Sequence, residues 1–102
     1  MSDPLKAIAR RITRRCLPYA TAAIREGRSE PWRSLLFDGA RHRIALIISG
    51  ERIDEAIAVI RDEIDLADFA IAGHLIAELR VTEVDRNGDD ALVTLDALTI
   101  ES

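Results

Sequence analysis

The sequence predicts a small α+β protein with the element order αββαββ, in which two helices pack on one face of a four-stranded, mainly antiparallel sheet. Two observations support this order. Each of two amphipathic, helix-like stretches is followed by a pair of strand-like stretches with a glycine-containing turn between them. The length of 102 residues, of which 48% are hydrophobic and 31% are charged, is typical of one globular domain, so residues 1–102 are expected to form a single unit.

The first helix is expected to begin at Asp3 and Pro4, because an aspartate caps free backbone N–H groups and a proline is tolerated in the first helical turn. Apolar residues then recur in steps of three and four, on a stripe made of Leu5, Ile8, Ile12, Cys16, Tyr19 and Ala23. The stripe keeps its phase past Pro18. We therefore expect one helix that is kinked at Pro18 and ends near Gly27.

The first hairpin is expected to join a strand over Trp32–Phe37 to a strand over His42–Ser49. Asp38-Gly39 is the expected turn, because this pair supplies the positive φ that tight turns need. Apolar residues occur on both sides of the second strand, which is typical of a central strand or of one covered on both faces.

The second helix follows Gly50, because apolar residues again repeat at helical spacing: Ile53, Ala56, Ile57, Ile60 and Ile64. Its outer face is acidic, with Asp54, Glu55, Asp62 and Glu63. The first helix instead carries basic residues off its apolar stripe: Lys6, Arg10, Arg11, Arg14 and Arg15. Residues 1–50 carry a net charge of +6 and residues 51–102 one of −10, which together give the chain's −4. We expect the two helices to neutralise each other, within one chain or between two copies.

The second hairpin is expected to join His74–Val84 to Ala91–Glu101 around Arg86-Asn87-Gly88. A two-residue turn at Asn87-Gly88 would mix polar and apolar side chains on one face. A three-residue loop with Gly88 in the left-handed conformation instead pairs like with like, and we prefer it. Its expected pairs are Leu79 with Leu95, Val81 with Val93, and Ala77 with Ala97.

In this register Glu78 lies opposite Asp96, with His74 and Arg80 on the same outward face. His74, Glu78 and Asp96 are therefore the candidates for an acid/base pair or a hard-metal site. The alternative is a slipped register that sets Arg80 against Asp96 as a surface ion pair, and we favour it over a functional site. We expect no cofactor and no metal.

The face of the sheet away from the helices is expected to carry Ile47, Ile76 and Leu98, and exposed aliphatic residues on that face suggest a second copy of the chain as partner. Cys16 is the single cysteine and lies on the apolar stripe, so we expect a buried thiol and no internal disulfide. The chain has neither a long apolar run nor a secretory signal, which predicts a cytoplasmic protein without a membrane contact. Arginine in place of lysine is typical of a GC-rich bacterial genome.

The leading interpretation is a non-catalytic, self-associating interaction protein, most simply a homodimer, whose opposite charges could also dock an acidic protein. The first alternative is a nucleic-acid binder that uses the basic helix face, although the two C-terminal strands offer no aromatic side chain for base stacking. The second alternative is a small enzyme or metal protein that uses His74, Glu78 and Asp96. No nucleophile stands next to a base at a recognisable spacing, which argues against an enzyme.

Overall fold

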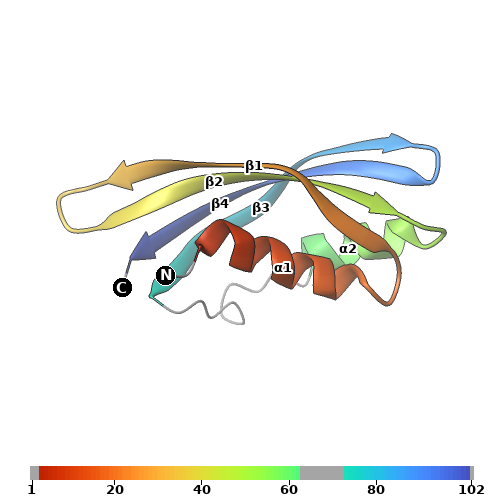
Figure 1. Cartoon of the computed structure of the whole chain (residues 1–102), viewed down its shortest axis with the longest axis horizontal. Coiled ribbons are helices and arrows are strands. Elements are labelled where there is room, and N and C mark those ends of the chain that lie inside the picture. The colour runs from red at the N-terminus through yellow and green to blue at the C-terminus, as the bar shows by residue number, and fades with distance from the viewer. Residues whose placement is uncertain (1–2, 63–72, 102) are drawn as a thin grey trace.

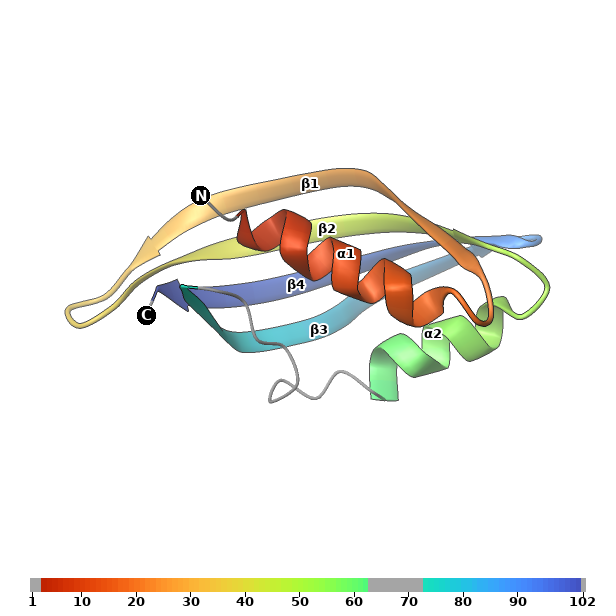
Figure 2. The same cartoon turned by 60° about the horizontal axis from the view of Figure 1, so that its bottom comes forward.

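The computed structural model describes residues 3–62 and 73–101, and its elements follow the order αββαββ. These elements are α1 (Pro4–Cys16), β1 (Thr21–Arg33), β2 (Asp38–Ser49), α2 (Ile53–Asp62), β3 (His74–Asn87) and β4 (Asp90–Glu101). The strands form one sheet in the order β1-β2-β4-β3, and all neighbours are antiparallel. Both helices lie on the same face of this sheet (Figures 1 and 2). The predicted fold class is confirmed.

Helix α1 begins as expected, because the Asp3 side chain accepts hydrogen bonds from the backbone N–H groups of Leu5 and Lys6. Its predicted continuation to Gly27 is wrong, since the helix ends at Cys16 and the next residues form a turn. Pro18 ends the helix instead of kinking it, because it has no N–H group to donate to the preceding turn. The N–H of Ala20 still bonds the Cys16 carbonyl at 2.8 Å, and β1 starts one residue later.

The first hairpin turns earlier than the sequence suggests. The expected strand over Trp32–Phe37 is wrong, since β1 ends at Arg33 and residues 34–37 form the turn. The Ser34 N–H donates to the Phe37 carbonyl at 2.8 Å, which closes this turn. The expected turn pair Asp38-Gly39 lies instead in β2.

Gly39 serves the close approach of two strands. A Cβ atom at this position would lie 2.0 Å from the Thr99 carbonyl oxygen of β4, which no real structure tolerates. Only glycine therefore allows β2 and β4 to pair in this way at this end of the sheet.

The second hairpin has Gly88 in the left-handed conformation, as expected, with a φ of 65°. The predicted three-residue loop over Arg86-Asn87-Gly88 and its register are wrong, because the turn is Gly88-Asp89 and Asn87 already pairs with Asp90. Further along, β3 contains two irregularities that each insert an extra residue: one between Ile76 and Glu78, the other between Val81 and Glu83. Each insertion moves the following side chains to the other face of the strand. The observed pairs include Leu79 with Ala97, Arg80 with Asp96, and Val81 with Leu95.

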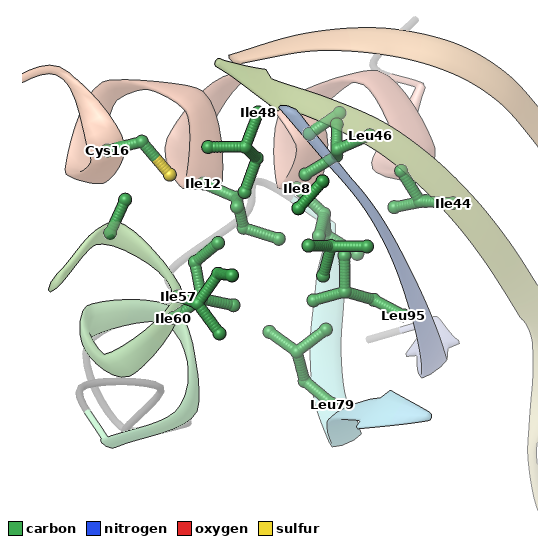
Figure 3. Packing of buried hydrophobic residues seen from close by; sticks show 14 of the residues in the cluster. Ile8, Ile12, Cys16, Ile44, Leu46, Ile48, Ile57, Ile60, Leu79 and Leu95 are labelled. Atoms are coloured by element: carbon green, nitrogen blue, oxygen red, sulfur yellow. The ribbon is translucent and has the colours of Figure 1, made fainter. Parts of the chain in front are cut away.

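The hydrophobic core lies between the sheet and the two helices (Figure 3). It receives alternate residues of β2 and β4 and the apolar stripes of both helices, including Ile8, Ile12, Cys16, Ile44, Leu46, Ile48, Ala56, Ile57, Ile60, Val93 and Leu95. Each fully buried aliphatic side chain contributes about 1.5–3 kcal/mol to the stability of the fold. Ile76 also belongs to this core, so its expected place on the open face of the sheet is wrong.

Candidate functional site

The face of the sheet that the helices leave uncovered carries charged residues in its middle. The strand registers place four of them in one row across the sheet: Arg28 on β1, Arg43 on β2, Asp96 on β4 and Arg80 on β3. The Nε atom of Arg43 donates to Asp96 Oδ1 at 3.1 Å. This bond raises the pKa of Arg43, so its guanidinium stays charged. A hollow of about 250 Å³ lies over this row and the next one towards the first hairpin turn.

Apolar side chains gather at the end of the open face that lies next to the turn of the first hairpin. The turn itself exposes Leu35 and Leu36 almost completely, by 103% and 83%, and Phe37 by 51%. Beside the turn, two neighbouring rows of the open face carry Trp32, Leu75, Leu98 and Ile100. We call these seven residues the apolar end. Most large apolar side chains of a monomeric protein are covered, and a contiguous exposed group of them marks an interaction site.

The backbone of this turn is well defined by local hydrogen bonds. Besides the bond between the Ser34 N–H and the Phe37 carbonyl, the Phe37 N–H donates to the Ser34 hydroxyl oxygen at 3.1 Å. At its base Arg33 faces Asp38 across the hairpin, with Nε and Oδ1 3.6 Å apart. The turn that contains the exposed Leu35 and Leu36 lies at the end of the paired strands β1 and β2 (Figure 1).

The two free edges of the sheet are unsuited to pairing with another strand. Edge strand β1 carries Pro31, which has no N–H group, and an irregularity between Ile24 and Glu26. Edge strand β3 carries its two insertions. Bulges, prolines and charges at edges are the usual protection against edge-to-edge association. Addition of a further strand at either edge is therefore disfavoured.

The predicted self-association residues do not form one patch. Leu98 lies at the apolar end, whereas Ile47 lies towards the opposite end of the open face, beside Leu92. Ile76 is buried among the core residues. Leu98 and Ile47 lie on the open face, as the side-chain alternation of β2 and β4 predicts. In β3 the alternation was assigned the wrong way round at Ile76, which lies on the helix side of the sheet.

The predicted chemical cluster is not assembled either. Glu78 and Asp96 both line the hollow of the open face, but Glu78 is paired with Leu98, not with Asp96. Arg80 is the residue paired with Asp96, as in the alternative register. His74 lies on the helix side of the sheet, because the insertion between Ile76 and Glu78 separates its phase from that of Glu78. It lines a second hollow of about 520 Å³ at the start of α1.

A buried polar group adjoins this second hollow. His42 Nδ1 lies 2.7 Å from the Ser29 hydroxyl oxygen, and its Nε2 lies 2.8 Å from that of Thr99. The Thr99 hydroxyl donates to the Ala40 carbonyl at 3.5 Å, so its oxygen accepts a hydrogen bond from Nε2–H, and Nδ1 accepts one from the Ser29 hydroxyl. Burial lowers the pKa of His42, with a smaller contribution from nearby His74 and an opposing one from Asp3. His42 is thus a neutral, fully bonded core residue.

The basic residues of α1 do not form one uniform surface. Lys6, Arg10 and Arg14 are exposed, whereas Arg11 and Arg15 are half-buried and engaged in interactions of their own. The acidic residues at the start of α2 are also engaged, since Asp54 pairs with Arg86 of β3 and Glu55 pairs with Arg52. Glu63 and Ile64 lie outside the described residues.

Cys16 is buried, as expected, and burial raises the pKa of its thiol to about 11. In residues 3–62 and 73–101, no group of three or more histidine, cysteine or carboxylate side chains is arranged to hold a metal ion. Within the same ranges no helix is long and apolar enough to cross a membrane.

The residues that the sequence reasoning missed are Leu35, Leu36 and Phe37. We assigned them to a strand because they are apolar, although three consecutive large apolar residues show no alternation between two faces. The lack of alternation next to Ser34 was the available signal.

Comparison of the chain with known protein families, with curated proteins and with solved structures gives no match.

Proposed function

We propose that this protein is a self-associating interaction module, in which the apolar end of one copy packs against the apolar end of a second copy. The observation that carries the proposal is the exposure of Leu35 and Leu36 at the tip of a hydrogen-bonded hairpin. An exposed apolar tip costs solubility, and a partner that covers it removes this cost.

The exposed apolar surface is large enough to support a dimer. Leu35, Leu36, Phe37 and Leu75 are together exposed by the equivalent of about three complete side chains. Covering this surface in both copies would contribute about 9–18 kcal/mol, at about 1.5–3 kcal/mol per side chain. The loss of translational and rotational freedom on association opposes it with about 4–15 kcal/mol. At the midpoints of these two ranges the balance favours association by about 4 kcal/mol, which corresponds to a Kd of about 1 mM.

The charges beside the apolar end favour a second copy over other partners. Glu30 of β1 and Arg41 of β2 are register partners in the row next to Trp32, and Glu78 of β3 lies in the same row. A nucleic acid or an anionic membrane would be repelled by the two carboxylates. In a symmetric contact, the carboxylates of one copy can face the arginine of the other, and the reverse, so that opposite charges meet around the contact.

Sedimentation equilibrium over a series of protein concentrations tests this proposal. The wild-type protein is expected to change from monomer to dimer within the micromolar to millimolar range. Leu36→Asp is expected to stay monomeric at every concentration, because a buried unpaired carboxylate opposes the contact. The far-ultraviolet circular dichroism of this variant should be unchanged, since Leu36 makes no contribution to the core.

Leu17→Asp is the matched control. Leu17 is also an exposed leucine, at 63%, but it follows the last turn of α1, away from the first hairpin turn (Figure 1). The Leu17→Asp variant should dimerise like the wild type. A wild-type protein that stays monomeric throughout the series, or a Leu17→Asp variant that dissociates as fully as Leu36→Asp, would contradict the proposal.

A further inference from the structure

The hollow at the centre of the open face is a second feature without an assigned role, and its residues differ from those of the apolar end. We propose that this hollow binds a small molecule through a carboxylate or phosphate group, which Arg28, Arg41 and Arg43 hold. Its volume of about 250 Å³ lies just below the usual range for small-molecule sites, which suits a small ligand.

The three arginines form one cluster on two neighbouring strands. Arg28 of β1 lies directly opposite Arg43 of β2, and Arg41 stands two residues from Arg43 on the same face of β2. Directly opposed residues in antiparallel strands have Cβ atoms about 4.5–5.5 Å apart, and like charges at that separation destabilise the sheet. An anion between the guanidinium groups would remove this repulsion.

The carboxylates of residues 3–62 and 73–101 leave part of this cluster unneutralised. Asp96 bonds the Nε atom of Arg43, and Arg80 flanks Asp96 from the other side. Within the described part of the chain, neither Arg28 nor Arg41 forms an ion pair or a side-chain hydrogen bond. Their guanidinium groups keep all five N–H donors free for a ligand.

Two further carboxylates on the wall of the hollow define the ligand more closely. Glu30 and Glu78 belong to the row next to the arginine row, on the two edge strands, whereas Arg41 occupies the middle of the same row on β2. The wall thus has four arginines and three carboxylates. A ligand with one anionic group can face the arginines while its hydroxyl or amino groups donate to Glu78. A long polyanion would meet repulsion from both glutamates.

Guanidinium groups fit this task because their planar forks donate two parallel hydrogen bonds to one carboxylate or phosphate group. A guanidinium group is a permanent positive charge under physiological conditions. Binding is therefore expected to depend on the charge of the ligand and on salt concentration, and hardly on the charge state of the protein.

Nuclear magnetic resonance of the arginine Nε–Hε groups tests the proposal. Inorganic phosphate and succinate are titrated separately into the protein at constant ionic strength, with sodium chloride as the balancing salt. At least one of the two is expected to shift the signals of Arg28, Arg41 and Arg43 along saturable curves, and the arm that saturates distinguishes phosphate from carboxylate. Arg41→Gln should weaken this binding at least tenfold, and Arg28→Gln serves as the second variant if Arg41→Gln unfolds.

Arg33→Gln is the matched control, because Arg33 lies on the same strand as Arg28 but outside the hollow and faces Asp38. The Arg33→Gln variant should bind phosphate or succinate with the same affinity as the wild type. Shifts that rise without saturation in both arms, or a loss of affinity in Arg33→Gln as large as in Arg41→Gln, would overturn the proposal, because either result would indicate general ionic screening. An absence of shifts in both arms would overturn it as well.

Discussion

Replacing Gly39 by alanine should destabilise the protein far more than replacing any residue of similar exposure with alanine. The added Cβ would lie 2.0 Å from the Thr99 carbonyl oxygen and 3.2 Å from the Ile100 Cα, and both are backbone atoms of β4. A backbone atom cannot rotate away, so the strands must separate locally or β2 must bend. Thr99 would then also move away from His42, whose Nε2 it holds at 2.8 Å.

The expected loss is at the upper end of the range for overpacked sites, about 3 kcal/mol of unfolding free energy. For a chain of this length, a loss of this size lowers the melting temperature by about 12–24 °C, at about 4–8 °C per kcal/mol. Urea unfolding, followed through far-ultraviolet circular dichroism, measures the loss directly as a shift of the midpoint.

Gly27→Ala is the matched control for this prediction. Its added Cβ would meet the Leu5 side chain at 2.9 Å, and a leucine side chain can move. Alanine restricts the unfolded chain more than glycine does, which stabilises the folded state by about 0.4–1 kcal/mol. The net change in the free energy of unfolding should therefore stay within about 1 kcal/mol. Equal losses in Gly27→Ala and Gly39→Ala would refute the reasoning, as would an unchanged midpoint for Gly39→Ala.

Two further predictions concern groups in the interior. Burial lowers the pKa of His42 from its ordinary value near 6.5, so the unfolded state binds a proton more readily than the folded state does. The free energy of unfolding should therefore have its full value above about pH 6.5 and decrease as the pH falls below it. His42→Asn should lose this part of the pH dependence in urea titrations, and an identical pH profile would count against the assignment. The Cys16 thiol, with its pKa raised to about 11, should react with a disulfide reagent only on unfolding, and rapid labelling of the native protein would contradict its burial.

The helix-versus-strand assignment failed where the local pattern is ambiguous. Residues 21–27 continue the apolar stripe of α1 by coincidence, and as part of an edge strand they are mostly exposed, so they show no alternation that would identify a strand. Pro18 was the correct signal for the helix end. Whether Pro18 ends the helix or only bends it depends on the pairing of residues 21–33 with β2, which the sequence alone does not display.

The core and the open face could be predicted to different extents. The buried residues of α1, α2, β2 and β4 follow directly from their periodicity. In β3 the insertion after Ile76 depends on how two strands fit each other, and it removed His74 from the face of Glu78. The arginine row required the true register, since Arg28 lies between the expected helix end near Gly27 and the expected strand start at Trp32, and was assigned to neither element.

The most direct test of self-association through the apolar end is a concentration series of ¹H–¹⁵N correlation spectra. If two copies meet as proposed, the backbone amide signals of residues 32–37, 75 and 98–100 shift as the protein concentration rises, and those of Ile47 and Leu92 stay in place. Concentration-dependent shifts confined to Ile47, Leu92 or the outer face of α1, or spectra that are independent of concentration, would contradict the account.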